Sequence, residues 1–332
     1  MPARPVPWTL AVPPEVLAEY AGVMLGAYYA EAEVMLRVQQ QTRAIFLREY
    51  RVDTGSPHVG PPSYVGVAAL GAQVVFPEDE QPMIANQGRV LETPDQVDAL
   101  EVPDPMQSDL FLRFLAMHEW MRARLGPGAS VGLGAGQQGP VTAAVLLRGE
   151  RFLEDLHQDP ARAHRLLGVT TEMHLRFRDV AARLSGATSL GGGLSDDFAG
   201  LLPPSLWPEF VLPYWRRLYE ALGSARRSLH SELLRRGHLK YLAQLGIVLF
   251  DPGMDQYLGV RDILEEVEIE FSWNIFTSRD MLQGTPDSIR RLYLGAVAAG
   301  APRMTAELCR GVPRENVHAY LDVARELGPA EG

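Results

Sequence analysis

The chain has 332 residues, 46% of them hydrophobic and 22% charged, which is an ordinary composition for a globular protein. Its formal net charge of −10 argues against a nucleic acid or an anionic membrane surface as a partner. The single cysteine excludes an intrachain disulfide framework, and the sequence has neither a long apolar run nor a signal-peptide core. These features together predict a cytoplasmic protein.

The first part of the chain predicts an irregular proline-rich arm over residues 1–14, followed by helix over 15–49. Beyond residue 51, helical segments that end at a glycine alternate with short β-branched runs, as in "YLAQLGIVLFD" (241–251). The further predicted helices are 106–125, 141–157, 160–185, 205–224, 259–266 and 286–300. The predicted strands are 74–76, 129–133, 188–194, 226–231, 246–251, 267–274 and 302–307.

This alternation requires parallel strands joined by crossover helices, and the number of strands suits an eight-stranded barrel better than a short doubly wound sheet. The sequence therefore predicts an α/β fold, a (β/α)8 TIM barrel with an N-terminal helical extension. Residues 1–50 are expected to form the arm and the extension, and residues 51–332 the barrel, within one domain overall.

The segment "GAGQQG" (134–139) matches G-x-G-x-x-G, the pattern of a dinucleotide-binding turn. That fingerprint also needs an acidic residue at the end of a second strand about 20 residues on. Here Glu154 lies in a segment that reads as helix, so a βα loop at the rim of the barrel is the favoured interpretation.

The carboxylates Asp196 and Asp197 in "SDDFAG" follow a predicted strand, and in barrels the carboxyl ends of strands carry the chemistry. Asp197 is the better candidate to face the pocket. The alternative is that one of the two caps the next helix.

His230 and Glu232 are two residues apart at the end of the strand predicted at 226–231, so both side chains project to one side. Cys309 follows the strand predicted at 302–307 and is expected at the same rim. A histidine, a carboxylate and a thiolate are zinc ligands, and three of them leave the open position that a catalytic site requires. A buried structural cysteine is the alternative.

At these residues the chain resembles the uroporphyrinogen decarboxylase superfamily, and in particular its zinc-dependent methylcobalamin:coenzyme M methyltransferases. The segments that carry the resemblance are "AALGAQVVFPEDEQPMI" (68–84), "GPVTAAVLLRGERFLEDLHQDPARAHRLL" (139–167), "DDFAGLLPPSLWPEFVLPYWRRL" (196–218), "NIFTSRDMLQGTPDSI" (274–289) and "CRGVPRENVHAYLDVARE" (309–326). Their order along most of the chain is more specific than any one of them.

The zinc motif of that branch, H-x-C-G, falls on His230 to Leu233, and its distant cysteine falls on Cys309. Glu232 replaces the middle cysteine and Leu233 the glycine, so the resemblance implies zinc held by His230, Glu232 and Cys309 with a harder ligand and an altered turn. The decarboxylase branch fits less well, because its arginine-rich "MRQAGR" signature and its aspartate before the "ALG" segment are missing.

The resemblance implies transfer of a methyl group from methylcobalamin, carried on a corrinoid protein, to a thiol or folate-type acceptor. Asp197 and Asn274 are then expected in catalysis, and Gly139, Pro140, Thr142 and Asp196 in substrate binding. A metal-free lyase and a non-catalytic partner of a corrinoid protein are the alternatives.

Overall fold

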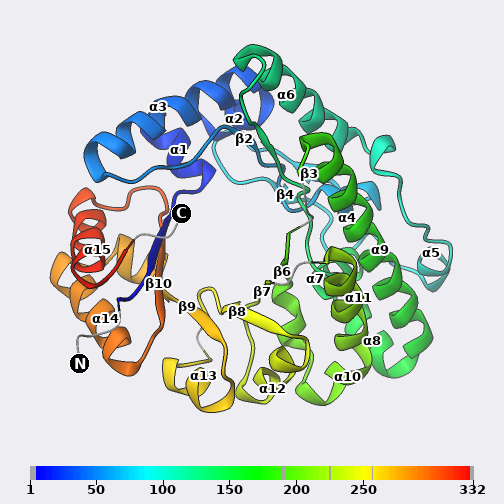
Figure 1. Ribbon diagram of the computed structural model, residues 1–332. Helices are drawn as coiled ribbons and strands as arrows, with labels where there is room; N and C mark the ends of the chain where they lie inside the picture. The colour runs from blue at the N-terminus through cyan, green and yellow to red at the C-terminus, as the bar shows by residue number, and fades with distance from the viewer. Residues whose placement is uncertain (1–4, 188–190, 224–225, 256, 330–332) are drawn as a thin grey trace.

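The computed structural model describes residues 5–187, 191–223, 226–255 and 257–329. Six parallel strands form one curved sheet in the order β1 (Trp8–Ala11), β10 (Arg303–Glu307), β9 (Glu270–Ile275), β8 (Ile247–Asp251), β7 (Arg227–His230) and β6 (Gly193–Ser195). A second parallel pair joins β2 (His58–Val59) to β5 (Gly132–Leu133). The eight strands line a ring with the helices outside it (Figure 1), which is the predicted barrel.

The helices that cover the barrel begin and end as follows: α1 Pro14–Ala21, α2 Leu25–Ala30, α3 Ala32–Tyr50, α4 Val65–Ala69, α5 Pro94–Asp98, α6 Asp109–Leu125, α7 Pro140–Arg148, α8 Glu150–Gln158, α9 Pro160–Ser185, α10 Trp207–Phe210, α11 Leu212–Leu222, α12 Arg236–Gln244, α13 Val260–Glu266, α14 Pro286–Ala299 and α15 Arg314–Leu327. Short 3₁₀ turns span Pro105–Gln107, Asp197–Leu201 and Pro204–Leu206, and a π-helical turn spans Thr277–Leu282. Among the described residues, no helix is long and apolar enough to cross a membrane.

The structure changes two predictions about the first part of the chain: an arm predicted to be irregular contains a strand, and one predicted strand lies outside the parallel set. The proline-rich arm contains β1, whose residues Trp8 to Ala11 pair with Met304 to Glu307 of β10 and so belong to the barrel wall. The strand predicted at 74–76 is β3 (Val74–Val75), which pairs antiparallel with β4 (Met83–Ile84) outside the eight parallel strands. Residues 188–190 of another predicted strand lie outside the described residues.

Several of the helices that lead into strands end at a glycine, as the sequence pattern predicts. Gly223 after α11 and Gly300 after α14 have φ values of 65° and 104°, in the left-handed region that glycine adopts without strain. The chain can therefore turn sharply from each helix into the next strand.

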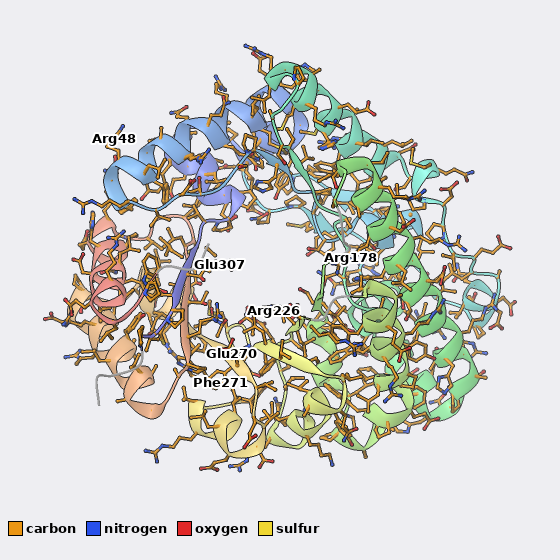
Figure 2. The ribbon with its side chains drawn as sticks, in the orientation of Figure 1. Arg48, Arg178, Arg226, Glu270, Phe271 and Glu307 are labelled. Atoms are coloured by element: carbon orange, nitrogen blue, oxygen red, sulfur yellow. The ribbon has the colours of Figure 1, made fainter. Side chains whose placement is uncertain are left out.

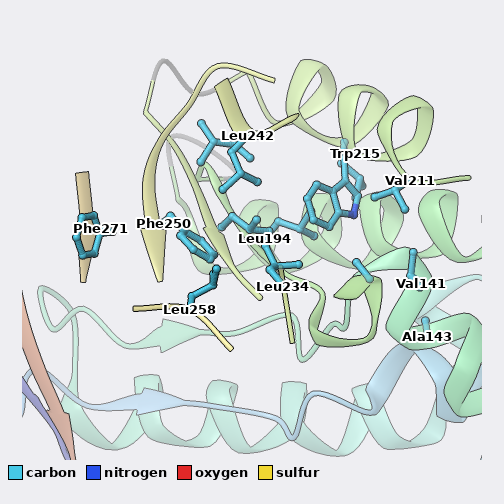
Figure 3. Close-up of a cluster of buried hydrophobic side chains, with 14 of the residues drawn as sticks. Val141, Ala143, Leu194, Val211, Trp215, Leu234, Leu242, Phe250, Leu258 and Phe271 are labelled. Atoms are coloured by element: carbon cyan, nitrogen blue, oxygen red, sulfur yellow. The ribbon is translucent and has the colours of Figure 1, made fainter. Parts of the chain in front are cut away.

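The core between the sheet and the helices fixes the carboxyl ends of β6 to β8. Trp215 on α11 packs among aliphatic side chains that include Leu194 of β6 and Leu234 after β7 (Figure 3), and all three are at most 2% exposed. Burial of each such side chain contributes about 1.5 to 3 kcal/mol, so the strand ends that carry the site rest on a rigid layer.

An acidic centre at the carboxyl ends of the strands

His230, the last residue of β7, lies between two carboxylates. Its Nδ1 is 3.0 Å from Oδ2 of Asp251, which ends the neighbouring strand β8. Its Nε2 is 3.4 Å from Oδ1 of Asp197, which follows β6. The three side chains are each about one-third exposed, so they are reachable from the mouth of the barrel.

Asp251 is held in place from two sides. The Asn274 side chain on β9 donates to its Oδ1 over 2.8 Å, and the backbone N–H of Gly253 donates to the same atom over 2.9 Å. Burial acts to raise the pKa of Asp251, but the hydrogen bond and charge of His230 outweigh it, so the pKa is lowered. Asn274 thus positions the partner of the imidazole.

Glu232 closes the centre. Its Oε1 accepts from the backbone N–H of Met254 over 2.9 Å. A Cβ at Gly253 would lie 2.5 Å from that Oε1 and 2.9 Å from Cε1 of His230, and Gly253 has a φ of +60°. Only glycine fits between Glu232 and His230.

The surrounding charge acts strongly on His230. Burial acts to lower the pKa of the imidazole, but the hydrogen bond and charge of Asp251, with the charges of Asp197 and Glu232, raise it to about 9. Burial raises the pKa of Asp197. The charge of His230 lowers this pKa, and the charges of Glu232 and Asp251 raise it further. No lysine or arginine is among them, so this is an acidic centre around one imidazole.

Leu233 follows Glu232 at the position where the methyltransferase motif has glycine. Its φ is 64°, which makes it one of only two non-glycine residues with positive φ in the described part of the chain. The backbone is therefore in the left-handed region that favours glycine, at a cost of about 1 to 2 kcal/mol for a side chain with a Cβ.

Asp196 and its neighbours hold the loop behind the centre. Asp196 is fully buried, and its carboxylate accepts from the backbone N–H groups of Val141 and Thr142 and from Nε1 of Trp215, at 3.2, 2.7 and 2.8 Å. Burial raises its pKa to about 6 against these hydrogen bonds. A Cβ at Gly139 would lie 2.4 Å from Asp196, so Gly139 allows the contact.

These contacts bear on two sequence interpretations. Thr142 is 3% exposed, Pro140 is the first residue of α7, and Gly139 lies against Asp196, so these residues hold the loop together here. Their role in substrate binding stays a prediction. The carboxylate of Asp196 also occupies the N-terminus of α7, where a dinucleotide pyrophosphate would bind. The "GAGQQG" segment is therefore a βα loop, as favoured above.

Cys309 follows β10 and is surrounded by acidic side chains. Burial and the charges of Glu15, Glu19 and Glu307 raise the pKa of its thiol. Glu307 is the last residue of β10 (Figure 2), and burial and the charge of Glu15 raise the pKa of its carboxyl group. The charges of His230, Asp251 and Glu232 act on this pKa more weakly. The described residues contain no group of three His, Cys, Asp or Glu side chains that could hold a metal ion.

The predicted zinc ligands are therefore only partly brought together. His230 and Glu232 share the acidic centre, and the bond from Nδ1 to Asp251 is the kind of contact that orients a ligating histidine. Among the described residues no third ligand is grouped with them, so no step below runs through a metal and the predicted zinc site stays a prediction. The sequence analysis missed Asp251, the last residue of the strand predicted at 246–251, and Gly253, two residues further on.

Comparisons with known proteins agree with this architecture. The family model for uroporphyrinogen decarboxylase (URO-D) matches residues 2–327, so the chain belongs to the uroporphyrinogen decarboxylase family. Uroporphyrinogen decarboxylases from three strains of Xanthomonas campestris pv. campestris are each 26% identical over 231 residues, 67% of this chain. The chain spans 63% of the length of these curated relatives.

A solved structure described as a methyltransferase from Methanosarcina mazei superposes with a TM-score of 0.73. The superposition covers 98% of this chain and 95% of the methyltransferase chain, and the two sequences are 18% identical. At this identity the likeness shows the fold, and that fold is the barrel predicted from the sequence.

The strain at Leu233 gives a first prediction. Leu233→Gly is expected to change the unfolding free energy by less than about 1 kcal/mol, because relief of the left-handed strain offsets the lost packing and the flexibility of glycine. Leu234→Gly is the matched control, since Leu234 is fully buried, and its cost is expected to be about 3 kcal/mol or more. Urea unfolding followed by circular dichroism measures both. Equal losses in the two variants would contradict the assignment of strain.

The pKa of His230 gives a second prediction. The folded value near 9 lies above the ordinary 6.5, so the stabilisation is complete below pH 6.5 and is lost as the pH rises through 9. We expect the unfolding free energy of chelator-treated protein to fall by about 1 kcal/mol more between pH 6.5 and 9.5 than that of His230→Gln, after allowing for solvent screening. His157→Gln, on an exposed turn of α8, is the control. Parallel profiles for the wild type and His230→Gln would contradict the assignment.

Proposed function

We propose that the protein is a methyltransferase that moves a methyl group from a methylated corrinoid to a thiol or similar small acceptor bound at the acidic centre. The observation that carries the proposal is the composition of that centre, in which the carboxylates of Asp197 and Asp251 contact one imidazolium and Glu232 adds a third negative charge. Family membership and the methyltransferase-like barrel support it.

The same observation weighs against the second candidate, decarboxylation of uroporphyrinogen, which the curated relatives favour by their names. A substrate with several carboxylates requires cationic side chains to hold it. Asp197, Glu232 and Asp251 would repel such a substrate at the strand ends where barrel enzymes carry out their chemistry.

In the proposed reaction, the acceptor thiol approaches Asp197 and Nε2 of His230, which lie 3.4 Å apart, from the mouth of the barrel. Asp197 takes the proton from sulfur, and burial prepares it for this by raising its pKa. The imidazolium of His230, held by Asp251 and Asn274, stabilises the thiolate. The sulfur then forms a bond to the methyl carbon, and the electron pair of the broken methyl–cobalt bond stays with the corrinoid.

The test follows the demethylation of methylcobalamin by its absorbance in the presence of purified protein and small thiols. Wild-type protein is expected to turn over, and His230→Ala to lose about 100-fold or more of the rate, since a positioned charge and proton path are removed. His157→Ala, an exposed histidine, should keep the full rate. No turnover with any thiol would refute methyl transfer, and carbon dioxide release from uroporphyrinogen would establish the alternative.

Zinc held by His230, Glu232 and Cys309 is a separate proposal, drawn from the resemblance and from the His230–Asp251 contact. It predicts about one zinc per chain in protein purified without added metal, with the zinc lost in His230→Ala and in Cys309→Ala and retained in His157→Ala. Elemental analysis gives the answer. A wild-type protein without zinc that still transfers methyl groups would discard the metal and leave the roles of Asp197 and His230 in place.

A further inference from the structure

A cavity of about 320 Å³ lies beside the acidic centre, where the barrel wall is not closed by strand pairing. Its walls are the loop after β5, the C-terminal half of α9, and Gly193 and Ser195 of β6. β6 pairs with β7 but is not bonded to β5 in a sheet, so the loop of residues 134–137 and α9 border the opening. The cavity is large enough for a small metabolite.

His174 on α9, in this wall, has one ring nitrogen without a hydrogen-bond partner among the described residues. It is 2% exposed and lines the cavity, and its Nδ1 lies 3.0 Å from the carbonyl oxygen of Gln138. With the proton on Nδ1, its Nε2 is an acceptor, and among the described residues this buried nitrogen has no hydrogen-bond partner. Burial lowers the pKa of His174 to about 4, so the ring remains a neutral acceptor at physiological pH. An unsatisfied buried acceptor costs about 1 to 3 kcal/mol, which a ligand with an N–H or O–H group would recover.

Arg178, one turn further along α9, gives the cavity a charge opposite to that of the acidic centre. Its guanidinium donates to the carbonyl oxygen of Gly193, a strand residue that also lines the cavity. Figure 2 labels Arg178 at the inner edge of the ring, on the opposite side of the ring centre from Glu307. A carboxylate would therefore be attracted to the cavity and repelled by Asp197, Glu232 and Asp251.

The cavity and the acidic centre are adjacent. Ser195, in the cavity wall, is the register partner of His230, and neighbouring strands are about 4.8 Å apart. Two residues after Ser195, Asp197 reaches His230. A small molecule in the cavity can thus extend one group past Ser195 to the imidazole.

We propose that this cavity binds the polar end of the methyl acceptor, and that the acceptor is a small thiol carrying a carboxylate and an N–H or O–H donor. The carboxylate lies toward Arg178, the donor bonds to Nε2 of His174, and the thiol extends to His230. This inference rests on the proposed function for the role of the thiol, but the binding of the polar end can be measured without any methyl donor.

The experiment uses three thiols of similar size, measured by isothermal titration calorimetry on the full-length protein without corrinoid. L-Cysteine has both the carboxylate and the ammonium group, 3-mercaptopropionate lacks the ammonium group, and cysteamine lacks the carboxylate. We expect L-cysteine to bind at least 10-fold more tightly than either of the others. Equal affinities for the three, or no binding, would overturn the proposal.

Variants assign the binding to the cavity. Ala182→Leu fills the space and is expected to weaken L-cysteine binding at least 10-fold, whereas Ala161→Leu, on an exposed position of the same helix, should have no effect. His174→Leu removes the acceptor, and His174→Gln, which keeps one, should restore part of the preference for L-cysteine over 3-mercaptopropionate. Binding that is unchanged in Ala182→Leu would overturn the site.

The outcomes separate the two proposals. Binding that Ala182→Leu weakens, without methyl transfer from methylcobalamin, would leave the cavity site standing and refute the proposed function. Methyl transfer to cysteamine or 3-mercaptopropionate with no preference for L-cysteine would retain the proposed function and refute the cavity as the acceptor subsite.

Discussion

The carboxylate of Asp196 is the contact on which the rest of the site depends. It binds the first N–H groups of α7 and the indole of Trp215, while its backbone N–H donates to His230 and its carbonyl oxygen accepts from Ser231. One buried residue thereby joins α7, α11, β6 and β7. A buried charge is costly unless it is fully hydrogen-bonded, so each of these partners is held in place. The positions of Ser195 and Asp197, on either side of Asp196, are fixed with it. Ser195 lines the cavity and Asp197 enters the acidic centre.

The two halves of the site have opposite electrostatic character. Around His230 the carboxylates raise the pKa of the imidazole and favour cations, whereas Arg178 favours anions across the width of one strand. A ligand that spans both is oriented by charge before any specific contact forms. Orientation of this kind is worth more to a group transfer than tight binding of either end alone, since the reacting atoms must be aligned.

Much of this architecture could be predicted from local pattern. The alternation of helices and buried strands indicated the barrel, and the two-residue spacing placed His230 and Glu232 together. The pattern failed where pairing depends on residues far away in the chain. The strand Trp8–Ala11 is four residues long, lies among prolines, and is a strand only because β10 is beside it. The sequence also does not show that Asp196 faces the N-terminus of α7, since that contact joins residues 54 and 55 positions apart. It places Cys309 after β10, but it does not show that Glu15, Glu19 and Glu307 raise the pKa of its thiol.

The pairing of β1 with β10 has a consequence for the order in which the molecule is made. Trp8 lies opposite Met304, so β1 finds its neighbour only after synthesis has proceeded as far as β10. From β6 to β10, by contrast, each strand pairs with the one that follows it, so that section can assemble as it emerges. Before β10 pairs with β1, the side chains of Val6, Trp8 and Leu10, which are buried in the folded protein, remain uncovered. Closure of the ring is thus a late event, and a nascent chain stalled before residue 300 would expose an apolar strand to chaperones.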